Sequence, residues 1–307
     1  MRVLVAGASG FIGTALVARL REHGHDVVRL VRRRAESADE SSWSPASGIL
    51  DFTVMDRADA VVNLSGASLA KLPWTKSYRQ ELIDSRLGAT RTLADAMRKA
   101  QRPPSVFLSA SAVGYYGDRP GELLVESSPR GDGFLAELVA RWETAAALAP
   151  RATRTVQFRT GLVIGAGGAL APVRTLTKFG LGSRIGLGGQ HWPWISLDDE
   201  VGAILHLLET SQLAGPVNLA GPTPATADRV TRALAERMHR PHAFVVPEKV
   251  LGLALGDAAD ELLLASQKVS PVRLVADGYE FAHPTIEDAV DALVSASRRR
   301  SAAGATA

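Results

Sequence analysis

The chain of 307 residues contains no cysteine, which excludes disulfides, thiolate zinc sites and cysteine nucleophiles. Lysine is scarce as well: only six of the 35 basic residues are lysines, and the net charge is +3. We interpret this arginine bias as a feature of genome composition. Because basic residues are not interleaved with aromatic ones along one face, we predict no nucleic-acid partner.

Long apolar runs are also missing, and the N-terminus enters a strand directly. We therefore expect no signal peptide, no membrane partner and a cytoplasmic protein. The seven histidines are scattered, without a His-Glu-x-x-His motif or paired-carboxylate spacing, so we predict no metal site. With 46% hydrophobic and 22% charged residues, the composition is that of a globular protein of one large or two smaller domains.

What is present begins with the opening sequence MRVLVAGASGFIG. Residues 2–6 predict an apolar strand, and residues 14–23 an amphipathic helix, with three glycines between them. Gly7 permits a tight turn, Gly10 lets a pyrophosphate approach the backbone, and Gly13 lets the helix pack close to the strand. Phosphates then bind at the helix N-terminus, so the pattern predicts a dinucleotide site. The alternative is a tight turn without a ligand.

The end of the second expected strand, residues 26–31, indicates which dinucleotide binds. NAD-preferring folds place an acidic residue there, whereas this chain has Arg32, Arg33 and Arg34. A guanidinium suits a 2′-phosphate by its charge and its forked donors. We therefore predict NADP (NADPH) as the cofactor, with Arg34 facing water.

Further cofactor contacts are expected where later strands end. The strand 59–64 runs into a small-residue turn, at the edge where open α/β sheets bind ligands. Arg86, on the long helix 74–100, either reaches this site or faces solvent. The predicted cofactor contacts are Gly7, Ser9, Gly10, Phe11, Ile12, Gly13, Arg32, Arg33, Leu64, Ser65, Gly66 and Ser109.

The alternation of strands and helices as far as residue 161 predicts an α/β fold with a Rossmann-like, doubly wound parallel sheet. Within it, residues 35–48 are expected to form a surface loop and residues 51–55 a weak third strand. Past residue 161 the chain becomes glycine-rich, which indicates a smaller C-terminal α+β substrate domain. We predict a Rossmann domain at 1–161 with a strand and helix returning at about 195–221, a substrate domain at 162–194 and 222–297, and a tail at 298–307.

Several motifs together resemble the extended short-chain dehydrogenase/reductase superfamily, also called the NAD-dependent epimerase/dehydratase family. The resemblance is closest to its branch of epimerase-family proteins with a C-terminal domain of unknown function, and it covers nearly the whole chain. It departs at Pro73, where a basic residue is expected before Trp74. The motifs are GASGFIG (7–13), VNLSGASL (62–69), SASAVGYYG (109–117), GFLAELVARWE (133–143), RTGLVIGAGGAL (159–170), WISLDD (194–199) and LLLASQKVSPVRLVADGYEFAHPTIEDAV (262–290).

The resemblance implies a catalytic serine, tyrosine and lysine, in which the tyrosine moves a proton while hydride passes to or from nicotinamide. Ser111 matches the serine. The tyrosine and lysine should lie four residues apart on a helix, yet the matching positions hold Phe134 and Leu138, neither of which titrates. The Tyr-x-x-x-Lys pair is therefore absent.

Three interpretations follow from this absence. Tyr115 or Tyr116 supplies the hydroxyl, or His191 does so from a substrate-side loop with Gln190 and Trp192, or no substrate is turned over. Glu143 reaches the site only if its helix face allows it. We predict an NADP-dependent oxidoreductase or epimerase acting on a small, sugar-like carbonyl or hydroxyl substrate. The alternative is a catalytically silent NADP-binding sensor or interaction protein.

Overall fold

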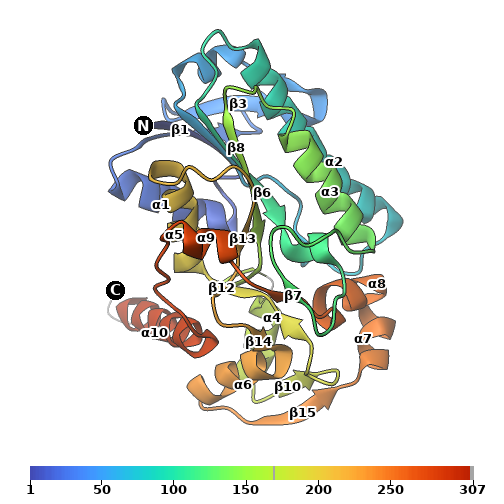
Figure 1. Cartoon of the computed structure of the whole chain (residues 1–307). Helices are drawn as coiled ribbons and strands as arrows, with labels where there is room; N and C mark the ends of the chain where they lie inside the picture. The colour runs from blue at the N-terminus through green and yellow to red at the C-terminus, as the bar shows by residue number, and fades with distance from the viewer. Residues whose placement is uncertain (169, 305–307) are drawn as a thin grey trace.

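A computed structural model describes residues 1–168 and 170–304, with side chains described as far as residue 296 (Figure 1). Eight strands build one sheet: β1 (Arg2–Ala6), β2 (Asp26–Val31), β3 (Glu40–Ser44), β4 (Ile49–Leu50), β5 (Ala60–Asn63), β6 (Val106–Ala112), β8 (Arg154–Thr160) and β13 (Gly215–Leu219). The remaining strands form two-stranded pairs: β7 (Leu123–Leu124), β9 (Leu162–Ile164), β10 (Gly182–Ile185), β11 (His191–Trp192), β12 (Trp194–Ser196), β14 (Ala225–Thr226), β15 (His242–Val246) and β16 (Lys268–Val269).

The helices alternate with these strands. They are α1 (Phe11–Glu22), α2 (Lys76–Lys99), α3 (Phe134–Ala146), α4 (Ala171–Lys178), α5 (Leu197–Glu209), α6 (Ala227–Arg237), α7 (Glu248–Leu255), α8 (Asp257–Ala259), α9 (Val272–Ala276) and α10 (Ile286–Gly304). Short 3₁₀ segments include Phe52–Arg57 and Val113–Tyr116, and Asp260–Leu264 is a π-helix. In the described part of the chain, no helix is both long enough and apolar enough to cross a membrane.

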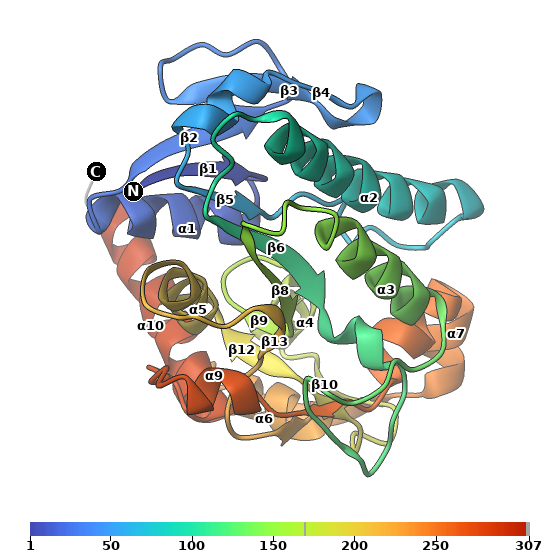
Figure 2. The same cartoon turned by 45° about the horizontal axis from the view of Figure 1, so that its top comes forward.

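The large sheet has the order β13-β8-β6-β5-β1-β2-β3-β4, and every neighbouring pair is parallel except β3–β4. Helices α1 and α5 cover one face, and α2 and α3 cover the other (Figure 2). This is the doubly wound α/β fold that the sequence predicts. Because parallel strands end at one edge, the loops after β1, β5, β6 and β8 lie together there.

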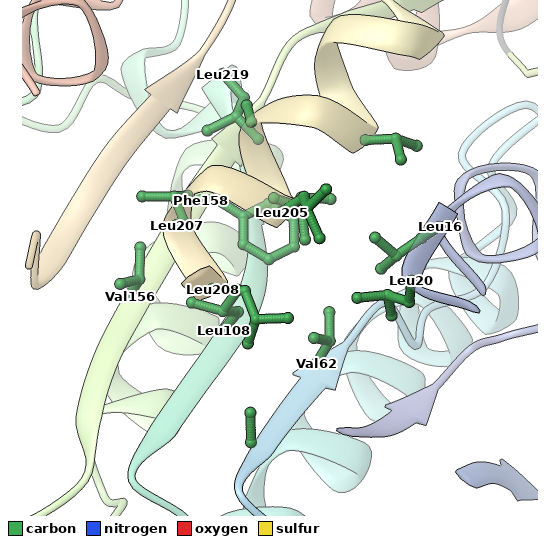
Figure 3. Close-up of a cluster of buried hydrophobic side chains, with 14 of the residues drawn as sticks. Leu16, Leu20, Val62, Leu108, Val156, Phe158, Leu205, Leu207, Leu208 and Leu219 are labelled. Carbon is green, nitrogen blue, oxygen red and sulfur yellow. The ribbon is translucent and has the colours of Figure 1, made fainter. Parts of the chain in front are cut away.

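Both faces of the central strands are apolar, as expected for a covered parallel sheet. Toward α1 and α5, Val62, Leu108 and Phe158 pack with leucines of both helices (Figure 3). Toward α2, Val61 and Phe107 join a second cluster. Two separate cores therefore hold the sheet between its helical layers.

The third strand lies elsewhere than predicted. Glu40–Ser44 forms β3 inside the segment expected to be a loop, and the expected strand at 51–55 is a 3₁₀ helix. Trp43 anchors β3 in the core beneath α2, while Glu40 is buried by ion pairs to Arg29 and Arg33. Because Glu40 is buried through ion pairs, the sequence of β3 shows no alternation of apolar and polar residues. The periodicity of the sequence therefore did not predict this strand.

The C-terminal part packs around a third core that includes Trp192, Trp194, α6 and α10. Its segment 257–270 returns to the large sheet's loops, where β16 pairs with β7 and the Ser266 N–H donates to Asp118. Helix α10 continues to Gly304, through most of the segment predicted as a tail. Residues 305–307 of that prediction lie outside the described residues.

Candidate functional site

The first glycine motif closes the end of β1 against the end of β5. Gly7 has φ +80°, and a Cβ on it would lie 2.7 Å from the carbonyl carbon and oxygen of Leu64. A Cβ on Gly13 would lie 2.2 Å from the Gly7 carbonyl oxygen. Because the obstructing atoms are backbone, neither position admits a side chain. The two chain segments therefore meet at the predicted cofactor site.

Helix α1 presents an uncapped N-terminus at this place. Gly10 is the N-cap residue, no side chain caps it, and the first turn carries no acidic residue. The Gly10 N–H donates to the Gly7 carbonyl and the Thr14 N–H donates to the Gly10 carbonyl, so the N–H groups of residues 11–13 between them are available to an anion. The Phe11 ring packs under the loop 165–168, where a Cβ on Gly165 would lie 2.4 Å from the ring.

The arginines after β2 differ in their surroundings. Arg33 donates to both carboxylate oxygens of Glu40 at 2.8 Å, and this pairing raises the pKa of Arg33 and lowers that of Glu40. Arg32 is exposed and makes no ion pair with the described part of the chain. Of the two predicted phosphate contacts, Arg32 is therefore the freer to bind a ligand.

The turn after β5 lies against a buried arginine of α2. A Cβ on Gly66 would lie 3.1 Å from Cζ of Arg86, and the Arg86 guanidinium stacks 5.3 Å from the ring centre of Trp142. Arg86 is 8% exposed and has no carboxylate partner among the described residues, and desolvation lowers its pKa to about 10. A buried cation without a counter-ion beside this turn suits an anionic ligand. The alternative that Arg86 faces solvent is wrong.

Ser111, near the end of β6, belongs to a charged cluster. Its Oγ donates to Oε1 of Glu143 at 2.6 Å. Arg159 of β8 donates to the same carboxylate from Nε at 2.7 Å and from the second guanidinium nitrogen at 2.9 Å. The face of α3 therefore does turn Glu143 toward the predicted catalytic serine. Ser111 and Arg159 are register partners in neighbouring strands, which fixes their proximity.

The two candidate tyrosines beside this cluster differ in how deeply they are buried. Tyr116 is fully buried, and its hydroxyl oxygen lies 3.0 Å from Arg159 and 2.7 Å from Oδ1 of Asn218. Burial also raises its pKa, so its placement argues against proton transfer by Tyr116. Tyr115 is half-buried, its ring lies 3.6 Å from Cζ of Arg159, and its hydroxyl makes no hydrogen bond to the described residues.

Two of the substrate-side residues, Gln190 and Trp192, make hydrogen bonds within the C-terminal part. The Gln190 amide donates to the carbonyls of Ile185 and Leu263, and the buried Trp192 indole also donates to Leu263. These contacts do not suit Gln190 and Trp192 to substrate binding. His191 is half-buried, and desolvation, followed by the charge of Lys268, lowers its pKa.

The N-terminus of α3 is closed by a residue that no sequence motif predicted. Glu261 of the π-helix accepts hydrogen bonds from the backbone N–H groups of Phe134 and Leu135, both at 2.7 Å.

Leu138 is buried in the adjacent core. Ser109 is fully buried on β6 beside Asn63, whereas Ser9 is exposed at the glycine turn. The described residues contain no group of three metal-ligating side chains.

A family model that matches most of the chain shows to which family the protein belongs. Residues 3–220 match the model of the NAD dependent epimerase/dehydratase family. The chain belongs to this family. Residues 246–293 also match a domain of unknown function, DUF1731. These matches correspond to the branch that the sequence motifs resemble.

Relatives in this family align along nearly their whole length. An epimerase family protein of Mycobacterium leprae is 42% identical over 290 residues, covering 94% of each chain. The human epimerase family protein SDR39U1 is 35% identical over 299 residues, which is 96% of this chain and 100% of the human one. A crystal structure of the human protein with NADPH superposes with a TM-score of 0.88 at 34% identity, covering 96% of this chain and 99% of that chain.

Proposed function

We propose that the protein binds NADPH and catalyses oxidoreduction or epimerisation of a small substrate bearing a carbonyl or hydroxyl group. The observation that carries this proposal is the conjunction of the uncapped α1 N-terminus with two arginines, Arg32 and Arg86, that have no carboxylate partner among the described residues. The similarity to a human relative whose structure contains NADPH supports the same cofactor.

Each part of the cofactor would find a matching group. The N–H groups at the start of α1 would hold the pyrophosphate, close to the backbone because Gly7, Gly10 and Gly13 carry no side chains. Arg32 would bind the 2′-phosphate. Arg86 would supply a buried positive charge beside Gly66. When bound, the nicotinamide supplies hydride transfer, and the chain's own residues position the substrate and handle its proton.

Calorimetric titration with NADPH and NADH tests the cofactor assignment. Arg32→Ala should weaken NADPH binding by roughly ten- to a hundredfold, because a hydrogen bond to a charged group is worth about 1.5–3 kcal/mol. NADH binding should change little. Arg34→Ala is the matched control, because Arg34 is an exposed neighbour without an ion-pair partner among the described residues. Equal weakening of both nucleotides by Arg32→Ala would contradict the 2′-phosphate contact.

A second function, a cofactor-binding sensor without turnover, is favoured by one observation. Phe134 and the buried Leu138 stand where the superfamily's tyrosine and lysine are expected, and neither side chain can move a proton. Under this alternative, NADPH would bind tightly yet no carbonyl compound would consume it. A spectrophotometric screen of carbonyl compounds at 340 nm, run after the calorimetry, separates the two functions.

A further inference from the structure

The cluster around Ser111 contains a carboxylate that a cofactor site alone does not need. Glu143 receives three hydrogen bonds, one from Ser111 and two from Arg159. Its side chain is 15% exposed and that of Arg159 is 2% exposed, so the ion pair lies mainly in the protein interior. Since a salt-bridged carboxylate only accepts hydrogen bonds, the single hydroxyl proton of Ser111 is directed toward Glu143.

This geometry restricts what Ser111 offers to a ligand. With its proton directed to Glu143, the Ser111 oxygen presents lone pairs, which accept a hydrogen bond and donate none. A substrate hydroxyl fits such an acceptor. Arg159 is held in turn by the Tyr115 ring and by the hydroxyl oxygen of buried Tyr116, so the carboxylate is supported from behind.

We propose that Glu143 is a positioning residue that orients Ser111 and receives the substrate proton through it, in place of the missing tyrosine and lysine. This inference rests on the proposed function. During alcohol oxidation, the carbinol C–H bond breaks and its hydride passes to the oxidised nicotinamide. The substrate O–H proton moves to the Ser111 oxygen as the Ser111 proton moves to Glu143, which leaves a carbonyl product and a protonated carboxyl group. Carbonyl reduction reverses every step.

The hydrogen bond itself can be measured without turnover. The infrared carboxylate band of Glu143 is identified as the band lost in Glu143→Gln. In Ser111→Ala this band should shift, because the carboxylate loses one donor. An unchanged band would show that the two side chains do not interact in solution and would overturn the proposal.

The proton role is tested by NADPH-dependent reduction of 9,10-phenanthrenequinone, a vicinal diketone used as the carbonyl probe. The wild-type kcat should fall in D₂O, because reduction transfers a proton from Glu143 through Ser111 to the product. Glu143→Gln should lower kcat about a hundredfold while leaving the KM for the probe nearly unchanged. Glu143→Asp should restore part of the rate and the solvent isotope effect.

The control is Glu137→Gln, which changes an exposed carboxylate on the same helix α3. It should leave the rate and its solvent isotope effect unchanged. All variants should bind NADPH within about twofold of the wild type by calorimetry. If the wild-type protein reduces the probe and Glu143→Gln retains its rate and solvent isotope effect, Glu143 has no part in proton transfer. If NADPH binds but the probe is not reduced, the oxidoreductase function fails and the proposal fails with it; if NADPH does not bind, the cofactor assignment has failed first.

Discussion

Glu200, in the first turn of α5, is a fully buried carboxyl group with little support. Its Oε1 accepts a hydrogen bond from the Thr160 hydroxyl at 2.7 Å, and its Oε2 has no hydrogen-bond partner in the described part of the chain. Desolvation raises its pKa from 4.5 to about 8. The group is therefore neutral in the folded protein at neutral pH.

The raised pKa makes stability depend on pH. Between pH 4.5 and about 8 the unfolded chain has released this proton while the folded chain retains it. The free energy of unfolding therefore falls as the pH rises, and the contribution is fully present only below pH 4.5. Each pH unit is worth about 1.4 kcal/mol, so Glu200 should cost about 3 kcal/mol between pH 5 and 7.5.

Glu200→Gln removes this titration while keeping the acceptor for Thr160. Urea unfolding at a series of pH values should therefore give a stability difference, variant minus wild type, that grows by about 3 kcal/mol from pH 5 to 7.5. The exposed neighbour Asp198→Asn serves as the control and should show no such growth. A difference that stays constant across this range would refute the neutral, buried state of Glu200.

Four further substitutions test the site and the elements that support it. Gly13→Ala should destabilise the fold by about 1–3 kcal/mol and abolish NADPH binding in calorimetry, because the new Cβ would overlap backbone atoms. Gly252→Ala should instead stabilise the fold by about 0.5–1 kcal/mol, because Gly252 lies in a helix and a Cβ there would meet no other atom. Arg86→Met should raise the midpoint of thermal unfolding while weakening the binding of both NADPH and NADH, since it removes a buried charge that has no carboxylate partner in the described part of the chain. A lower midpoint with unchanged affinity would contradict this. Glu261→Ala should lower stability by about 1–2 kcal/mol in urea unfolding through the loss of its two backbone hydrogen bonds, and an unchanged midpoint would contradict the cap.

The sequence predicts those parts of the fold that depend on local pattern. The glycine motif can be recognised in the sequence because Gly7 and Gly13 stand where backbone atoms leave no room for a Cβ. This steric requirement calls for glycine at a fixed spacing. The order of strand, turn and helix follows from periodicity. By contrast, β3 is stabilised by an ion pair and one tryptophan, for which no periodic pattern exists.

The candidate site is less predictable because its contacts join distant residues. Ser111 and Glu143 are 32 residues apart, and they meet only because α3 packs over the end of β6. The burial of Arg86 likewise depends on the packing of α2 against the turn at Gly66. The family resemblance pointed to the serine, but only the packed helices show what the serine contacts.

The cap that Glu261 places on α3 has a consequence for how the chain holds together. The family match that ends at residue 220 and the match that begins at 246 divide the chain along its length, yet the second segment supplies the hydrogen bonds that close the helix carrying Glu143. Removing the second segment would also leave Asp118 and the Gly117 carbonyl without these partners. The two segments therefore share hydrogen bonds beside the site, and we expect that loosening the C-terminal segment loosens the helix that carries Glu143.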